Sequence, residues 1–278
     1  MSVSSSVWTP SSFMRGTFIW HAVAIGAVVI QPDVWMTSLS MILANQLLLT
    51  LAGIWPRSRI LGPNWTHLPP AARAHGWVAI TIDDGPDPDV TGRVLELLDQ
   101  HRAKATFFCI GQHAADYPEL CRAIIDGGHG LENHSLNHRL GFAFSGYWGF
   151  LRELSEAQQV LKVASGQSPR FFRAPFGIRN PLLDPVLSRL GLQLVSWTRR
   201  GFDTRETDVD VVVKRLTQGL AAGDILLLHD AHAARARDSG QPMILAALPR
   251  VLAAIDAAGL TCVTLQTAAE ASATPGSQ

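Results

Sequence analysis

From residue 77 onward, short apolar runs alternate with longer segments whose apolar residues recur at helical spacing. The first run, 77–82, is followed by Val90, Val94 and Leu98, which share one face of a helix. Repeated strand–helix units of this size predict a parallel sheet, either open or closed into a barrel. The expected strands are 77–82, 105–110, 129–133, 171–172, 192–197, 224–228 and 261–265. The expected helices after 90–98 are 117–125, 148–163, 181–190, 208–221 and 243–258.

Side chains that could take part in catalysis or in ligand binding come directly after these expected strands. In parallel α/β folds, active sites collect at the carboxyl ends of the strands. The residues found there are Asp83, Asp84, His134, His138, Arg173, Trp197, His229 and Asp230. The pattern therefore predicts one site at one edge of the sheet.

The N-terminal region is almost free of charge. Residues 1–56 contain only Arg15 and Asp33, whereas the whole chain has 23 basic and 23 acidic residues. A break near Asp33 divides the apolar stretch into 17–30 and 34–55. The second part is long enough for a helix that crosses a bilayer core, which needs about 20 residues.

Three interpretations compete for this stretch. A membrane hairpin or single anchor is preferred, buried core helices of a soluble domain are the alternative, and a cleaved signal peptide is disfavoured because the region is long and doubled. With two spans at a bacterial-type inner membrane, Arg15, Arg57 and Arg59 favour a cytoplasmic location for both ends. If only 34–55 spans, the rest of the chain lies on the opposite side from the N-terminus.

The expected organisation has four parts. They are an N-terminal membrane segment at 1–60, a linker at 61–75, an α/β domain at 76–266 and a flexible tail at 267–278. A formal net charge of zero argues against nucleic acid as the partner, because phosphate-binding surfaces need a basic excess. The three cysteines are too few and too scattered for a disulfide framework or a cysteine-based zinc site.

Two motifs suggest a cation site. Asp83 and Asp84 are adjacent carboxylates, which are not both stable as charges unless one binds a cation or the pair shares a proton. His134 and His138 have the i, i+4 spacing that places two imidazoles on one face of a helical turn, as in zinc sites. Each motif also has an ordinary explanation, namely turn chemistry for the aspartates and a solvated polar face for the histidines.

Two further motifs suggest proton transfer and charge stabilisation. The loop 173–177 starts with Arg173, which could pair with a carboxylate while backbone N–H groups after Pro175 point inward. His229 ends a buried strand and is suited to general acid catalysis near neutral pH. An ordinary strand exit and a capping histidine are the alternatives. His232 is expected in a surface loop, and Glu132 in a strand away from ligand spacing.

The order of these motifs resembles that of the NodB-homology polysaccharide deacetylases, carbohydrate esterase family 4. Five motifs occur in this order between residues 77 and 265: Asp-Asp, His-x-x-x-His, Arg-x-Pro-Phe, Trp with a later Asp, and Leu-x-His. The resemblance implies a distorted (β/α) barrel, preceded here by the hydrophobic segment. It also implies a hydrolase that removes N-acetyl groups from amino sugars with a divalent metal. Zinc is the expected metal, with cobalt, nickel and manganese as alternatives.

The resemblance also assigns roles to individual residues. It implies that Asp84, His134 and His138 bind the metal, that Asp83 is the catalytic base and that Arg173 orients this base.

On the other side of the reaction, the resemblance implies that His229 protonates the leaving amine and that Asp203 tunes this histidine. The backbone N–H of Phe176 would help to hold the oxyanion, and Leu227 would form part of the pocket for the acetyl methyl group. The implied substrate-binding residues are Phe176, Pro175, Trp197 and Leu227.

The chain also departs from the family pattern. Ile82 replaces a commoner aromatic residue before Asp83, and Arg200 and Thr204 stand where an acidic residue and a tryptophan are often found. Arg199 and Arg200 add positive charge near the expected cleft. This suggests a substrate that bears phosphate or another anion, and the alternative that both arginines are solvated or paired with acidic residues is equally open.

Three functions follow for the whole chain. The first is a deacetylase at a membrane, acting on an N-acetylated glycan or a lipid-linked amino sugar. The second is a metal-dependent deformylase or other amidohydrolase with a non-polymeric substrate. The third, a non-catalytic carbohydrate-binding barrel, is disfavoured because every expected ligand and both proton carriers are present.

Overall fold

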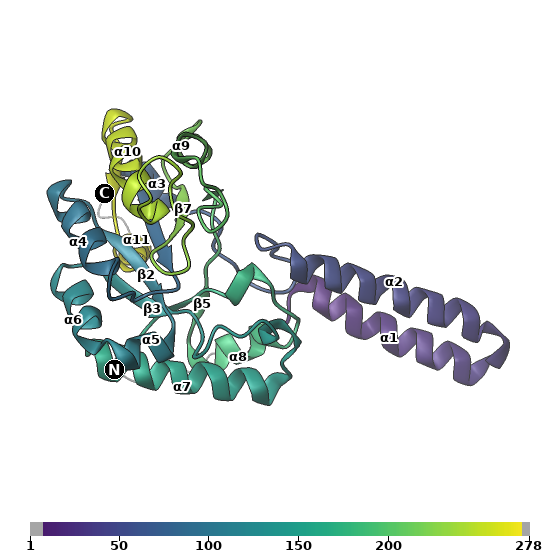
Figure 1. Cartoon of the computed structure of the whole chain (residues 1–278). Coiled ribbons are helices and arrows are strands. Elements are labelled where there is room, and N and C mark those ends of the chain that lie inside the picture. Colours follow the sequence, from purple (N-terminus) through teal and green to yellow (C-terminus); the bar gives the residue numbers. More distant parts are fainter. Residues whose placement is uncertain (1–7, 274–278) are drawn as a thin grey trace.

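A parallel sheet forms the centre of the computed structural model, which describes residues 8–273 (Figure 1). Within this range eight strands pair in the order β5-β4-β3-β2-β1-β7-β6, with β8 pairing to β1, and every strand pair is parallel. The strands are β1 Trp77–Asp83, β2 Ala105–Cys109, β3 Gly130–Asn133, β4 Phe171–Phe172, β5 Gln193–Leu194, β6 Arg199–Arg200, β7 Ile225–His229 and β8 Thr261–Cys262. This is the half-barrel form of the predicted (β/α) barrel, so the expected fold class is confirmed.

The three central strands are buried almost along their whole length because helices cover the sheet. β2 and β7 are entirely buried, and β1 is buried from Val78 onward. Continuous apolar strands of this kind are typical of parallel sheets with both faces covered. The register places Asp83 opposite both Phe108 and His229, so two predicted site residues lie at the same level of the sheet.

The helices pack around this sheet. α7 packs against α5 and α6, and α10 packs against α9. The longer helices of the barrel are α4 Thr91–Gln100, α6 Pro118–Asp126, α7 Tyr147–Ser165, α8 Leu183–Leu190, α9 Val209–Thr217 and α10 Met243–Ala257. The remaining helical segments are α3 Pro70–Ala74, α5 Gly111–Asp116, α11 Leu265–Ala273, η2 Phe142–Phe144 and η3 Pro175–Gly177.

Several expected boundaries were wrong. The predicted strand at 192–197 is only two residues long, and a second short strand, β6, follows it. The predicted flexible tail from 267 is the helix α11 as far as Ala273, because buried Leu265 and Ala268 pack it against the core beside α3. The rest of that tail and residues 1–7 lie outside the described residues.

The predicted linker at 61–75 is bound to the barrel. The Trp65 N–H donates to the carbonyl of Leu194 at 2.9 Å, and the Trp65 carbonyl accepts from the Ser196 N–H at 2.8 Å. Trp65 also packs its ring against Phe171, with the ring centroids 5.3 Å apart. These contacts extend the edge of the sheet beyond β5, so the segment belongs to the folded domain.

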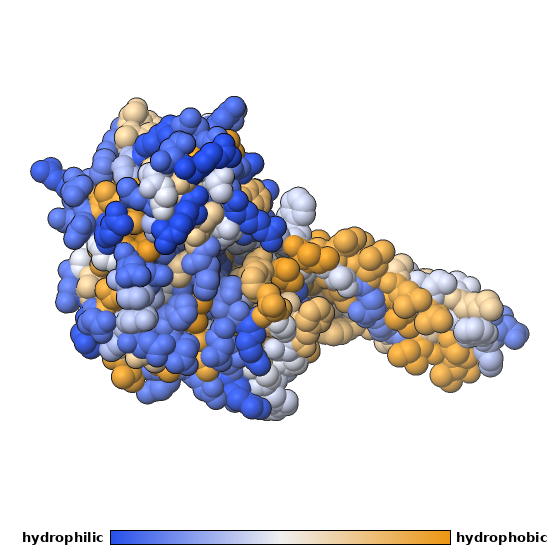
Figure 2. Space-filling model, viewed as in Figure 1, coloured by the Kyte–Doolittle hydropathy of each residue, from blue (hydrophilic) through white to orange (hydrophobic). Residues whose placement is uncertain are grey.

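The two apolar N-terminal segments form an antiparallel hairpin that projects from the barrel (Figure 1). α1 Ser12–Ile30 and α2 Trp35–Ile54 are joined through η1 Pro32–Val34, where the sequence break was expected. Hydrophobic surface covers much of this hairpin (Figure 2), and Val29 and Met36 are 76% and 63% exposed. The helices are therefore not buried in the core of this chain, and both are long and apolar enough to cross a membrane.

The hairpin joins the barrel through a close backbone contact. The Arg179 N–H donates to the carbonyl of Gly53 at 3.1 Å, and a Cβ on Gly53 would lie 2.2 Å from the carbonyl oxygen of Arg179. Only glycine fits there, because real Cβ atoms do not approach backbone oxygen so closely. Five residues after Gly53, the Ser58 carbonyl accepts from Nη2 of Arg179 at 2.6 Å. The end of α2 is thus fixed to the loop after η3.

Candidate active site

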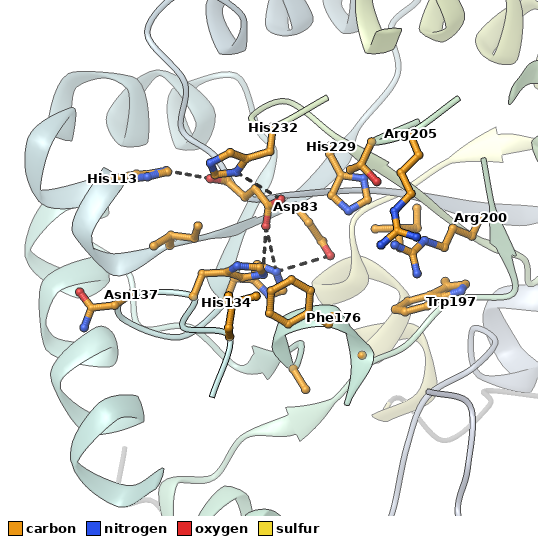
Figure 3. Close-up of a pocket in the computed structure, with 18 of the residues that line it drawn as sticks. Asp83, His113, His134, Asn137, Phe176, Trp197, Arg200, Arg205, His229 and His232 are labelled. Atoms are coloured by element: carbon orange, nitrogen blue, oxygen red, sulfur yellow. Dashed lines mark hydrogen bonds and ion pairs between the residues drawn. The ribbon is translucent and has the colours of Figure 1, made fainter. Parts of the chain in front are cut away.

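A cavity of about 550 Å³ opens at the carboxyl ends of the strands (Figure 3). The predicted residues that line it are Asp83, Asp84, His134, His138, Phe176, Trp197, Leu227 and His229. Arg173 and Asp203 lie behind this wall, each bonded to a residue that faces the cavity. Pro175 is buried and faces a different cavity, so it does not line this one.

Asp84, His134 and His138 form a cluster that could hold a metal ion. Oδ1 of Asp84 lies 3.3 Å from Nε2 of His134 and 3.4 Å from Nε2 of His138. The same carboxylate oxygen is buried and has no hydrogen-bond partner among the described residues. A buried acceptor left in this state is costly, and a divalent cation between the three side chains would satisfy it. The residues present therefore fit the expected metal.

A loop, and not the predicted helical turn, brings the two histidines together. Oδ1 of Asn133 accepts the Ser135 N–H at 2.8 Å, and Oγ of Ser135 accepts the His138 N–H at 3.0 Å. Ser135 and His138 both adopt left-handed backbone conformations, with φ of 69° and 46°. Side-chain hydrogen bonds of this type compete with helix formation. The i, i+4 spacing thus selected two histidines that do lie together, although a loop and not a helical turn brings them there.

The protonation states suit a metal site. Burial opposes the charge of Asp84, but the close contacts with His134 and His232 and the attraction from His134 and His229 keep its pKa below the ordinary value. Burial, together with repulsion from His134, lowers the pKa of His138 to about 4. Near neutral pH the aspartate is charged and His138 is neutral, as metal binding requires. Nδ1 of His134 contacts the Arg173 carbonyl at 2.9 Å, which orients its Nε2 toward the cluster.

Asp83 is held by the most buried cation of the site. Nη1 of Arg173 donates to Oδ1 of Asp83 at 2.6 Å and to Oγ1 of Thr81 at 2.8 Å, and Nη2 donates to the Ser196 carbonyl at 2.9 Å. The guanidinium lies 4.2 Å from the ring centroid of Phe108 and is only 1% exposed. One carboxylate oxygen is therefore fixed by the protein, and the other, Oδ2, lies 3.8 Å from Nε2 of His134.

His229 faces Asp83 from the neighbouring strand β7 (Figure 3). Its Nδ1 lies 2.9 Å from Oδ1 of Asp203, whose Oδ2 accepts the His229 backbone N–H at 2.7 Å. Burial opposes the imidazolium, but attraction from Asp203, reinforced by Asp83 and Asp84, raises the pKa of His229 to about 9. The ring is thus charged at neutral pH, and its other nitrogen is available to the cavity.

The remaining predicted residues shape the walls. Phe176 has a φ of 58° in η3, and its ring stands 4.6 Å from that of His138. Gly177 follows with a φ of 73°, and a Cβ there would lie 2.7 Å from the Trp197 ring. This pair of left-handed residues turns the chain sharply at the rim of the cavity. Leu227 and Trp197 also line the cavity and are both buried, and the Trp197 ring lies against the turn at Gly177.

Two histidines that the sequence analysis did not assign lie beside the cluster. Nδ1 of His232 is 3.6 Å from Oδ2 of Asp84, and Nδ1 of His113 contacts the Asp84 carbonyl at 2.8 Å. A hydrogen bond with Asp84 raises the pKa of His232. No local sequence pattern identifies His113 as a site residue. For His232, the only sequence signal was its position three residues after His229.

The two arginines near the cleft differ. Arg199 pairs with Asp224 and donates to the carbonyls of Gln218 and Gly219, as the paired alternative predicted. Arg200 lines the cavity and lies over the rings of Trp197 and Phe202. Within residues 8–273 it forms no ion pair, and its buried Nε has no hydrogen-bond partner. Among the described residues, Arg200 is thus a cavity-lining arginine without a direct ion-pair partner.

Comparison with known proteins agrees with this geometry. A sequence model described as polysaccharide deacetylase matches residues 72–195. A chitooligosaccharide deacetylase from Sinorhizobium fredii is 35% identical over 154 residues, which are 55% of this chain and 71% of that protein. This chain belongs to the polysaccharide deacetylase family.

Other family members support the same assignment. A peptidoglycan-N-acetylglucosamine deacetylase from Bacillus cereus is 33% identical over 190 residues, or 68% of this chain and 85% of that protein. A solved family 4 carbohydrate esterase from Streptomyces lividans, in complex with acetate, is 33% identical with a TM-score of 0.61, covering 69% of this chain and 95% of the other. The matched family segment, residues 72–195, includes Asp83, Asp84, His134, His138 and Arg173. The N-terminal hairpin lies outside it.

Proposed function

We propose that this chain is a metal-dependent deacetylase that removes N-acetyl groups from an amino sugar at a membrane surface. The observation that carries the proposal is the arrangement of Asp84, His134 and His138 beside a facing carboxylate and imidazolium. Asp83 and His229 face each other in register on adjacent strands, with the three cation ligands beside them. Amide hydrolysis needs a base for water and an acid for nitrogen, and the site offers both.

A divalent cation held by these three residues would supply Lewis-acid activation of water and of the acetyl carbonyl. Asp83 accepts a proton from the water molecule while the water oxygen attacks the carbonyl carbon. Arg173 holds this carboxylate in position through the 2.6 Å bond to Oδ1, so that Oδ2 is directed to the reacting water. The Phe176 N–H, at the sharp turn of η3, helps to stabilise the negative charge on the former carbonyl oxygen.

His229 completes the reaction from the opposite side. The C–N bond breaks as the imidazolium donates its proton to the amide nitrogen, and the products are acetate and the free amino sugar. Asp203 keeps His229 protonated at neutral pH for this step. Buried Leu227 offers an apolar wall for the acetyl methyl group, and Trp197 offers a face for the sugar ring.

The hairpin supports a membrane location. Its two helices have 19 and 20 residues, and most of their large apolar side chains are exposed. The start of α1 and the end of α2 both lie at the barrel (Figure 1), and Arg15 is near the first of these ends while Arg57 and Arg59 follow the second. With two spans, this favours the cytoplasmic face of a bacterial-type inner membrane. The substrate is then an N-acetylated glycan or lipid-linked amino sugar within reach of that face.

Measuring acetate and formate release from matched N-acetyl and N-formyl sugars tests the proposal. The protein is loaded with zinc, cobalt, nickel or manganese in turn. We expect acetate release to require a metal and to exceed formate release. Faster formate release would favour the deformylase alternative. If neither acetate nor formate is released with any of the four metals, the non-catalytic barrel is favoured.

A further inference from the structure

The catalytic cavity contains two arginines that the proposed reaction does not use. Arg200 ends β6, Arg205 lies five residues later, and both line the cavity. Figure 3 shows that their guanidinium groups are directed toward the space between His229 and Trp197. Arg200 is the register partner of Leu227, two residues before His229 on β7, and neighbouring strands lie about 4.8 Å apart. Because His229 is the proposed proton donor for the amide nitrogen, the two cations border the part of the cavity that receives the sugar.

Two aromatic rings hold the guanidinium of Arg200. Its Cζ lies 5.3 Å from the ring centroid of Trp197 and 5.0 Å from that of Phe202. Aromatic faces attract a cation, but neither ring offers a hydrogen-bond acceptor. Nε of Arg200 is buried, whereas Nη1 and Nη2 are not fully covered and have no hydrogen-bond partner among the described residues. These two groups form one edge of the guanidinium, so this edge is free to bind an oxyanion.

The acidic side chains nearby already have partners. Among the cavity's own carboxylates, Asp83 pairs with Arg173, and Asp84 contacts the histidines of the metal cluster. Within residues 8–273, no ion pair or side-chain hydrogen bond involves Arg200 or Arg205. The four acidic residues between positions 200 and 210 are used as follows: Asp203 contacts His229, Glu206 pairs with Arg215, Asp208 caps α9, and Asp210 pairs with Arg250.

The segment that carries the two arginines is fixed by the catalytic machinery itself. Asp203 lies between them in the sequence, and its Oδ2 accepts the His229 N–H at 2.7 Å. The Phe202 carbonyl accepts the Arg205 N–H at 3.0 Å, and Phe202 has a φ of 61°. The loop that brings Asp203 to His229 thus also places Arg200 and Arg205 at the cavity, without the help of a ligand.

An oxyanion suits this arrangement better than a neutral sugar does. Two guanidinium groups directed toward one space repel each other, and an anion between them offsets this repulsion. Phosphate and carboxylate oxygens accept two parallel N–H bonds from the guanidinium fork, and these charge-assisted bonds are stronger than bonds to a neutral hydroxyl. The two arginines therefore favour a substrate with an acidic substituent.

We propose that Arg200 and Arg205 bind an acidic group, a phosphate or a carboxylate, on the amino sugar or on the residue joined to it. The sugar packs against Trp197, and its acetamido group extends from there toward His229 and the metal ligands. The two arginines determine specificity and take no part in bond breaking. This inference rests on the proposed deacetylase function and narrows its substrate class to N-acetylated sugars with a negative charge near the reacting nitrogen.

The test compares three substrates with the full-length, zinc-loaded protein. They are N-acetylglucosamine 1-phosphate, a hyaluronan tetrasaccharide in which glucuronate alternates with N-acetylglucosamine, and neutral chitotetraose. We expect kcat/KM to be highest for an acidic substrate, and the better of the two identifies phosphate or carboxylate as the group that is bound. Arg200→Gln should lower kcat/KM for that substrate by about 10- to 100-fold, mainly through KM, because charge-assisted hydrogen bonds are lost. The loss on chitotetraose should be at least about tenfold smaller.

Two further variants and a control separate charge from packing. Arg200→Lys keeps the charge but loses the fork, so it should retain part of the preference for the acidic substrate. Arg205→Glu reverses the charge at an exposed position without an ion pair, so folding is not at risk, and it should lower kcat/KM for the acidic substrate at least about tenfold. Arg152→Gln, at an exposed position of α7 outside the cavity, changes the net charge as Arg200→Gln does and should alter none of the three activities.

The outcomes distinguish this inference from the function on which it rests. Equal losses on all three substrates in Arg200→Gln would show that the side chain only supports Trp197, and would overturn the proposal. A wild-type protein that prefers chitotetraose to both acidic substrates would overturn it as well. If no substrate releases acetate, the deacetylase function fails, and calorimetric binding of the deacetylated forms of the two acidic substrates still decides the inference. Binding of one of them should weaken at least about tenfold in Arg205→Glu. Binding of both that stays unchanged in this variant, as contact with the metal alone would give, would refute the role of the arginines.

Discussion

Replacing Asp203 with asparagine removes the charge that keeps His229 protonated. The aspartate contacts both Nδ1 and the backbone N–H of the histidine, at 2.9 and 2.7 Å. Asparagine retains the size of the side chain and an acceptor for Nδ1–H, but it carries no charge. Burial, which disfavours the imidazolium, is then opposed only by Asp83 and Asp84. We therefore expect the pKa of His229 to fall from about 9 to its ordinary value of 6.5 or below.

The size of the effect follows from the titration. A fall of at least about 2.5 units corresponds to about 3 kcal/mol of lost preference for the imidazolium. At pH 8 the protonated fraction of His229 falls from about 0.9 to about 0.03, so kcat/KM for acetate release falls about 30-fold. At pH 6 the same calculation gives a loss within about twofold. The defect thus grows as the pH rises.

The assay is acetate release against pH for both proteins loaded with the same metal. A bound cation also repels the imidazolium and lowers the pKa of His229 in both proteins. The decisive quantity is therefore the difference in pH between the alkaline limbs of the two activity profiles. Asp208→Asn is the matched control, because Asp208 caps α9 through the N–H groups of Asp210 and Val211 and asparagine caps equally well. An alkaline limb that does not move in the Asp203 variant would refute the assignment of His229 as the general acid.

Four other predictions follow from the structure. Asp83→Asn should lower kcat by about 10²- to 10⁴-fold with zinc affinity retained, since this residue moves a proton and is not one of the three ligands; unchanged turnover in the zinc-loaded variant would exclude Asp83 as the base. A chelator should abolish acetate release and added zinc should restore it, whereas full activity after verified metal removal would contradict the metal requirement. Gly53→Ala should lower the free energy of unfolding by about 1–3 kcal/mol in chemical denaturation, because the alanine Cβ would lie 2.2 Å from the Arg179 carbonyl oxygen. An unchanged denaturation midpoint would show that α2 can shift to avoid this contact. A C-terminal alkaline phosphatase fusion should be inactive if the barrel is cytoplasmic, and activity would place the barrel in the periplasm.

Sequence periodicity predicted the sheet well because its central strands are continuous apolar runs. β1, β2 and β7 are buried by helices on both sides, and this leaves a pattern that is visible without a structure. The short edge strands β5 and β6 have no such pattern, since two residues show no alternation. α11 was missed because its residues are small, and its burial depends on α3, almost 200 positions earlier.

The candidate site was predicted residue by residue where a motif identified it. The contacts of Asp203 with His229 and of Arg173 with Asp83 link positions 26 and 90 residues apart, and the resemblance suggested both. His113 reaches the cluster from α5, a helix that the sequence analysis did not predict. The contacts of Arg179 could not be predicted at all. They depend on the approach of α2 to a loop about 125 residues later.

The close joint between Gly53 and Arg179 also determines how far this protein could reach. A hydrolase on a flexible stalk explores a volume and can meet a polymer well above the bilayer. Here the segment after α2 is bound at once, since the Pro56 carbonyl accepts from both Asn64 and Ser196, and Ser196 lies beside Trp197 at the cavity. If the hairpin is embedded, the mouth of the cavity is held at one height and one tilt. Encounters with a lipid-linked substrate would then take place by lateral diffusion in two dimensions, and the thickness of the bilayer would become a determinant of turnover.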